Sequence, residues 1–122
     1  MKEILRGVVN RDLEAVVEVE ILFDDAAQMF RFVIDTGFTG TMMIPSEIAA
    51  RFPIDGQEVF VAVEDTEFRG DTHRLKLRWL AEEISISAIA SEQGYALIGM
   101  EMLLGAKLGI DLTRHTVLIE KE

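Results

Sequence analysis

The chain has 122 residues, 49% of them hydrophobic, so it can bury a core but is too short for two full domains. Its 12 Lys and Arg against 22 Asp and Glu give a formal net charge of −10, which disfavours nucleic acid and anionic membranes as partners. The absence of cysteine excludes disulfides, thiol catalysis and cysteine-ligated zinc. We therefore expect one domain that spans residues 1–122.

The N-terminal residues show no targeting signal. Residues 1–6 contain no apolar run of the length found in secretory signals. No later segment approaches the roughly 20 apolar residues of a membrane-spanning helix. We expect a cytoplasmic protein with no membrane partner.

Alternation of apolar and polar residues predicts strands along most of the chain. In residues 16–23 every odd position is apolar, and in residues 72–80 Leu75, Leu77 and Trp79 alternate with basic residues. The other predicted strands cover residues 29–34, 58–63, 84–90 and 116–119, with turns at residues 24–25 and 82–83. This pattern predicts an all-β fold, a small barrel or sandwich.

Helical signals are few and short. Ser46 is suited to cap a helical turn that runs to Arg51 and is stopped by Pro53. A second short helix is predicted over residues 101–104, where Gly105 ends it. We therefore expect one or two short helices beside the strands.

Common catalytic motifs are absent. The chain has no phosphate-binding loop, no dinucleotide-binding glycine pattern, no H-E-x-x-H and no serine nucleophile elbow. The two histidines, His73 and His115, lie far apart in the sequence, and we interpret each as a strand residue rather than a metal ligand. We predict neither a metal nor a cofactor.

One segment, Phe32–Gly40, carries a candidate site, because an apolar strand there ends in Asp35, Thr36 and Gly37. Burying a lone carboxylate is costly unless it is paired or hydrogen-bonded, and strand ends commonly carry functional residues. Gly37 lets the backbone approach the carboxylate and donate its N–H to it. Taken alone, the pattern also fits an acid that caps a turn, with Gly37 and Gly40 as turn residues.

The order of motifs gives the pattern a context. Asp35-Thr36-Gly37, followed later by Leu97-Ile98-Gly99 and a short helix, resembles the retropepsin-like aspartic proteases. The likeness is greatest to the small single-domain bacterial and archaeal members. It covers nearly the whole chain in order and spacing, because it extends through three further segments: Phe38-Thr39-Gly40, Met42–Pro45 and Leu108–Asp111.

The resemblance implies a closed or half-closed acid-protease β-barrel with one catalytic Asp35 in each chain. It implies an endopeptidase that acts on peptides or unfolded protein as a homodimer, in which two Asp35 carboxylates activate a water. Thr36 is expected to hydrogen-bond across the pair, and Gly37 to donate its N–H near the carboxylates. Further residues are expected beside the substrate or packed behind the catalytic loop: Phe38, Thr39, Leu97, Ile98 and Gly99.

The resemblance also implies a hairpin that covers the substrate. The candidate hairpin starts at residues 59–63 and returns through Phe68, with Glu64, Asp65 and Thr66 at its tip as substrate-binding residues. Relatives usually have a glycine at the tip, whereas the nearest glycine here is Gly70. An acidic tip is expected to disfavour acidic peptides and to tolerate basic ones.

Two other interpretations of the chain stay open at this point. One is a non-catalytic β-domain of the same fold that binds a peptide by strand addition at a barrel edge. The other is a regulatory dimer whose protease activity is switched by assembly. For any dimer, the terminal residues 5–9 and 116–119 are the expected interface elements.

Overall fold

The computed structural model describes residues 2–61 and 67–121. Within them, two short helical elements accompany the strands, α1 (Ser46–Ala49) and the 3-10 helix η2 (Met100–Leu103). The prediction of an all-β chain with one or two short helices is therefore confirmed. The strands join in one sheet and are, in chain order, β1 (Glu3–Val9), β2 (Ala15–Leu22), β3 (Ala27–Ile34), β4 (Met42–Pro45), β5 (Ile54–Val61), β6 (Glu67–Trp79), β7 (Glu82–Ser91), β8 (Leu97–Ile98), β9 (Lys107–Asp111) and β10 (Thr116–Lys121).

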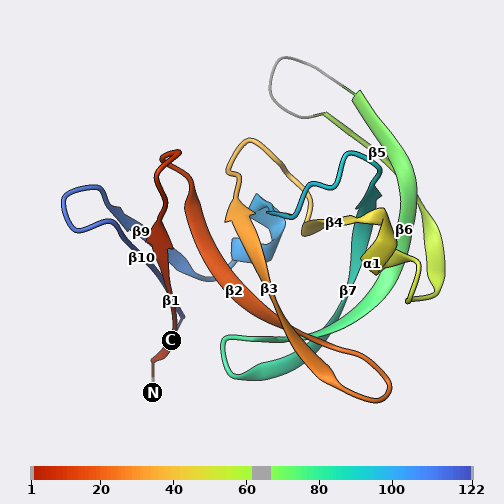
Figure 1. The fold of residues 1–122 in the computed structure, drawn as a ribbon, viewed down its shortest axis with the longest axis horizontal. Helices are drawn as coiled ribbons and strands as arrows, with labels where there is room; N and C mark the ends of the chain where they lie inside the picture. The colour runs from red at the N-terminus through yellow and green to blue at the C-terminus, as the bar shows by residue number, and fades with distance from the viewer. Residues whose placement is uncertain (1, 62–66, 122) are drawn as a thin grey trace.

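The sheet curls into a partly closed barrel (Figure 1). Strands β6, β7, β4, β8, β3 and β2 follow one another in the sheet, and β2 then pairs back with β6. This seam joins Glu20 to Arg78 and Ile21 to Leu77, and the Arg78 guanidinium lies 3.3 Å from the Glu20 carboxylate. The half-closed form of the expected barrel is thus present.

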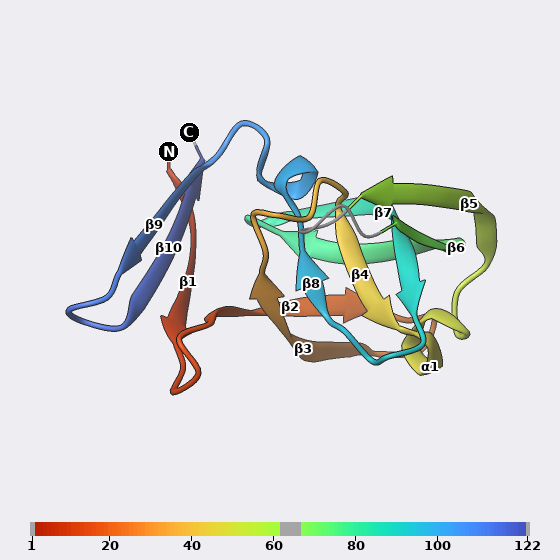
Figure 2. The same cartoon turned by 90° about the horizontal axis from the view of Figure 1, so that it is seen from above.

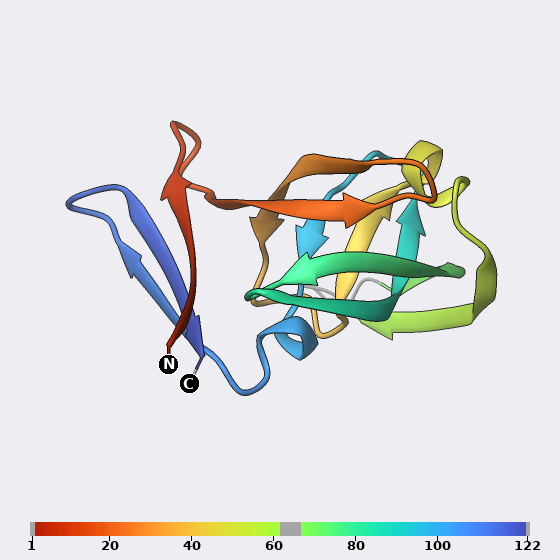
Figure 3. The ribbon, with the colours of Figure 1, turned by 90° about the horizontal axis from the view of Figure 1, so that it is seen from below.

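Two extensions leave the barrel. Strand β5 pairs with β6 as a hairpin, and residues 67–71 of β6 extend beyond the ladder that β6 forms with β7. On the other side, β1 pairs with β10, and β10 pairs with β9. Figures 2 and 3 show these three strands as an arm beside the barrel, with both chain termini at its end.

The barrel interior takes the apolar side of the alternating strands. Because successive side chains of a strand point to opposite faces, the period of two puts one set inside. Each buried large aliphatic side chain contributes about 1.5–3 kcal/mol. The buried residues include those that the alternation indicates, namely Val17, Val19, Ile21, Leu75, Leu77 and Trp79, and also Phe32, Ile34, Met42 and Ile98.

Two local predictions are wrong. Pro45 occupies the N-cap position of α1 with an extended ψ of 140°, so Ser46 is already helical and makes no capping hydrogen bond. The turn between β6 and β7 lies at Leu80–Ala81 rather than at residues 82–83, because Trp79 already pairs with Glu82. Leu80 and Ala81 both have positive φ, 48° and 66°, as two-residue hairpin turns require. Neither residue type is typical there, so the sequence concealed the turn.

Candidate functional site

Asp35 follows β3 directly, and the neighbouring strand fixes its backbone. Strands β3 and β8 are parallel, with Val33 opposite Leu97 and Ile34 opposite Ile98. The Asp35 N–H continues this ladder and donates to the Ile98 carbonyl oxygen at 2.9 Å. The fold therefore brings together the two segments on which the resemblance rests.

The loop after Asp35 holds the carboxylate. The Gly37 N–H donates to Asp35 Oδ1 at 2.9 Å, and the Phe38 N–H donates to the Asp35 carbonyl oxygen at 3.1 Å. The donation predicted for Gly37 is therefore present. The same bond also closes a turn around the acid, so it fits both the catalytic and the turn-capping interpretation.

Gly99 locks this loop against the start of η2. The Gly99 N–H donates to the Thr41 carbonyl oxygen at 2.8 Å, and the Met100 N–H donates to the Phe38 carbonyl oxygen at 2.8 Å. A Cβ atom on Gly99 would lie 2.2 Å from the Gly40 carbonyl oxygen. Since its φ of −98° suits any residue, Gly99 is needed here for space.

Asp35 and Thr36 line a cavity of about 490 Å³ with an apolar rim. Asp35 is half-buried and Thr36 is exposed. Three further lining residues are large, apolar and exposed: Leu13 at 75%, Leu112 at 64% and Ile110 at 47%. Leu13 lies between β1 and β2, and the other two lie at the end of β9 or just beyond it.

The terminal segments predicted as interface elements pair with each other within the chain. Leu5 lies opposite Ile119, and Gly7 lies opposite Val117, in the ladder between β1 and β10. Ile119 and Val117 are buried. The exposed apolar residues beside Asp35 are Leu13, in the turn after β1, and Ile110 and Leu112, at and just beyond the end of β9. Within the predicted interface segments, Val8 is also exposed.

The other predicted site residues divide into exposed and buried groups. Leu97 lines the Asp35 cavity, and Thr39 is exposed beside the loop. Phe38 is 2% exposed and packs against Met43 and Ile89, so it supports the site from beneath. Ile98 is 0% exposed, so its side chain acts through the core rather than on a substrate.

The candidate hairpin exists as far as the structure describes it. Strands β5 and β6 pair from Ile54 opposite His73 to Val61 opposite Glu67. The predicted tip residues Glu64, Asp65 and Thr66 lie outside the described residues, as do residues 62 and 63.

An acidic group that the sequence did not single out ties the base of this hairpin to the barrel. The hydroxyls of Thr72 on β6 and Ser87 on β7 both donate to the Asp55 carboxylate of β5. These two bonds, Ser87 first, lower the pKa of Asp55 below its ordinary value of 3.8, and Arg74 at 4.0 Å adds a smaller effect. The network fixes the direction in which the hairpin leaves the barrel.

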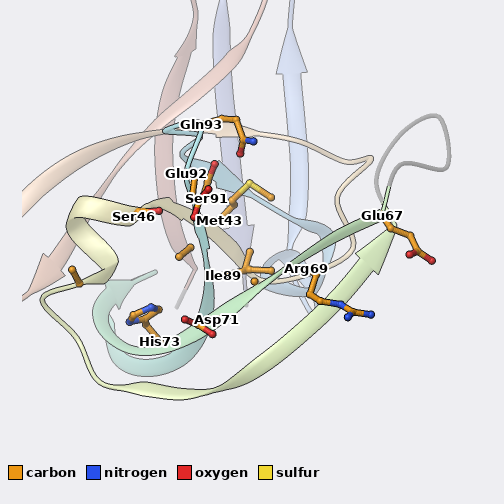
Figure 4. A pocket seen from close by; sticks show the side chains of 13 residues that line it. Met43, Ser46, Glu67, Arg69, Asp71, His73, Ile89, Ser91, Glu92 and Gln93 are labelled. Carbon is orange, nitrogen blue, oxygen red and sulfur yellow. The ribbon is translucent and has the colours of Figure 1, made fainter.

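A second cavity, of about 570 Å³, opens where β6 leaves β7 (Figure 4). The ladder between these strands ends at Thr72 opposite Ile89, and beyond it residues 67–71 pair with β5. The space between them and residues 90–93 forms the cavity. His73 lines it, and the sequence offered one sign of this, a histidine on the apolar side of its strand.

One row of side chains connects the two cavities. Val33 on β3 lies opposite Leu97 on β8, which lies opposite Met43 on β4, which in turn lies opposite Ile89 on β7. Directly paired residues share a face of the sheet. Because Val33 and Leu97 line the Asp35 cavity and Met43 and Ile89 line the second, this row runs from one cavity to the other. His73 pairs with Ala88, so it contributes to the second cavity from the opposite side of β6.

Comparisons of the chain with protein-family models, with curated proteins and with solved structures found no match. In residues 2–61 and 67–121, no three His, Asp or Glu side chains gather closely enough to hold a metal ion. Across the same residues, no helix has both the length and the apolar character needed to cross a membrane. The residues of the site itself therefore indicate its chemistry.

Proposed function

We propose that the chain is an aspartic endopeptidase that works as a homodimer on peptides or unfolded protein. The observation that carries the proposal is the half-buried Asp35 carboxylate, held by the Gly37 N–H just after the buried Ile34 at the end of β3 and open to a cavity. The parallel pairing of β3 with β8 supports it, because it joins the two segments that resemble retropepsin-like proteases.

The chemistry needs a second carboxylate, because one group cannot act as acid and base in the same step. Two Asp35 side chains at a two-fold axis share one proton, since like charges about 3 Å apart cannot both ionise. The ionised carboxylate takes a proton from water, whose oxygen attacks the peptide carbonyl carbon, while the other carboxyl gives its proton to the carbonyl oxygen. The diol then collapses: the carboxyl that took the proton from water gives it to the amide nitrogen, and the other carboxylate takes a proton from a diol hydroxyl. The C–N bond breaks to leave an acid and an amine, and the two carboxyls again hold one proton.

The surface around Asp35 supports the second copy. Leu13, Ile110 and Leu112 expose apolar area at the rim of the cavity, which a second chain would bury. The Thr36 hydroxyl makes no hydrogen bond within the described residues, so it remains available to the partner. The second copy therefore supplies both the missing carboxylate and the cover for this surface.

Cleavage assays on the Asp35→Asn variant test the proposal. Wild type and variant are incubated with an unfolded protein and a mixed peptide library between pH 4 and 7, and their dimerisation is checked by sedimentation. Asn keeps the shape of the side chain and removes the acid. Wild type should cut, and the variant should lose about 10²–10⁴-fold of the rate while staying folded and dimeric.

Other results have distinct meanings. If a folded, dimeric wild type cuts nothing, the protease proposal fails and a peptide-binding domain of the same fold takes its place. If only monomer is found and it is active, the shared-carboxylate mechanism is wrong. Cytoplasmic location remains a prediction from the sequence.

A further inference from the structure

We propose that the cavity between β6 and β7 is a subsite that takes a lysine or arginine side chain of the substrate. The inference rests on the proposed function, and it names the substrate class that this function prefers. The cavity lies at the far end of the row that starts beside Asp35. A peptide that crosses the sheet along this row has its reacting bond at one cavity and a side chain in the other.

The floor of the cavity suits an aliphatic stem. Met43 and Ile89 are buried, line the cavity and pack against Phe38. Lysine and arginine lay their methylene groups along apolar surface and keep the charge in a polar setting. The volume of about 570 Å³ leaves room for such a side chain together with water.

Arg69 also lines the cavity, but among the residues that the structure describes its guanidinium forms no ion pair with the carboxylates there. Asp71 and Glu92 line it, and within the described residues neither of them has an ion-pair partner; Asp71 accepts only from the Gln57 amide at 3.2 Å. Figure 4 shows Arg69 and Glu67 directed away from His73 and Asp71. A ligand that brings positive charge would therefore meet two unpaired carboxylates.

His73 adds a further acceptor. Its Nδ1 lies 2.9 Å from the Phe52 carbonyl oxygen, which can only accept, so Nδ1 carries the proton. With the proton on Nδ1, Nε2 is left as an acceptor, and it has no partner among the described residues. His73 is 7% exposed and lines the cavity. Ammonium and guanidinium groups, which donate and never accept, match this set of atoms.

The test uses binding, so that it does not depend on cleavage. The folded Asp35→Asn protein is titrated into a short fluorescein-labelled peptide that has one central lysine among alanine and leucine, and anisotropy is read. The same peptide with an acetylated lysine keeps the stem and loses the charge. The lysine peptide should bind about fivefold or more tightly than the acetylated one.

Paired variants separate the cavity from the overall charge. Asp71→Asn combined with Glu92→Gln should abolish the preference for the charged peptide. Glu82→Gln combined with Glu83→Gln, at the exposed start of β7, changes the net charge equally and should leave the preference intact. Glu92→Gln alone, at an exposed position, should halve the preference or more even if the double variant does not fold.

Two outcomes would overturn the inference: equal binding of both peptides, or an equal loss of preference in the control pair. Neither result touches the protease proposal, which depends on the Asp35 cleavage assay. Conversely, if the wild type binds the lysine peptide more tightly but cuts no substrate, the subsite proposal stands and the protease proposal fails.

Discussion

The two cavities joined by the row of Val33, Leu97, Met43 and Ile89 differ in what one chain supplies. The Asp35 cavity has an apolar, exposed rim, and two carboxylates line it, Asp35 and the exposed Glu14, whose Oε1 accepts from the Asn10 side-chain amide. Under the proposed mechanism, this cavity still needs a second Asp35 and a cover for its rim. The cavity at His73 has a buried apolar floor and polar walls in the same chain. Assembly should therefore affect cleavage strongly and side-chain recognition weakly. The following experiments test this difference, in order of decreasing effect.

The largest effect is expected from charging the apolar rim. Leu13→Asp combined with Leu112→Asp should weaken the dimer by about a hundredfold, because two apolar side chains no longer find an apolar partner surface. Sedimentation across a dilution series measures the change. Leu104→Asp alters a leucine that is equally exposed but lies outside the cavity, and it should leave the dimer intact. If this control dissociates as readily, the interface lies elsewhere.

Mixing active and inactive chains should give the next largest effect. Because the proposed mechanism needs two Asp35 side chains at each site, a ninefold excess of Asp35→Asn chains should lower the activity per wild-type chain about tenfold after exchange. Peptide cleavage at constant wild-type concentration measures this. Asp35→Asn chains that also carry the two rim substitutions should not inhibit. If the activity per wild-type chain does not change when the variant is added, one chain is sufficient for cleavage.

A smaller effect is expected from filling the space at Gly99. The added methyl group of Gly99→Ala would meet the Gly40 carbonyl oxygen, so the loop must shift, at a cost of about 1–3 kcal/mol in the free energy of unfolding. The melting temperature and the rate of peptide cleavage should both be lower than in the wild type. Gly109→Ala, whose methyl group would make only an ordinary van der Waals contact of 3.9 Å with the Leu118 carbonyl oxygen, should melt like the wild type. An unchanged Gly99→Ala protein would show that the loop is not locked.

The smallest effect concerns the base of the hairpin. Because hydrogen bonds lower the pKa of Asp55 below 3.8, its charged form stabilises the fold above that pH, and the contribution is lost as pH falls through the folded pKa. Asp55→Asn should therefore lower Tm at pH 7, and the difference in Tm between variant and wild type should become smaller in acid. Asp24→Asn, at an exposed turn position, provides the matched control. A gap that does not change with pH would contradict the assigned cause.

Part of the candidate site could be predicted, and part could not. Asp35, Thr36 and Gly37 could be singled out as a candidate site because an apolar strand ends in them. The resemblance to retropepsin-like proteases, and not these three residues alone, favoured a catalytic role over a turn cap. The burial of Phe38 was one of two open possibilities, which only packing decides. The Asp55 network was not predictable, because it joins residues from three strands at positions distant in sequence.

The second cavity was hidden for the same reason. Its lining comes from three separate parts of the chain, residues 43–50, 67–73 and 89–93. The alternation in residues 72–80 predicts a strand but does not say where that strand leaves its neighbour. That point is set by the pairing of β6 with β5 rather than with β7.

By itself, the sequence determined the all-β class, the alternating core residues such as Val17 and Leu75, and the candidate acid, because these depend on local period and residue type. Only the tertiary structure decided the closure of β2 on β6, the place of the terminal strands in an arm, and the row that links the two cavities. These features depend on which strands become neighbours, and strand pairing joins backbone groups that every residue carries. A one-dimensional pattern therefore cannot specify them, whereas the folded sheet does.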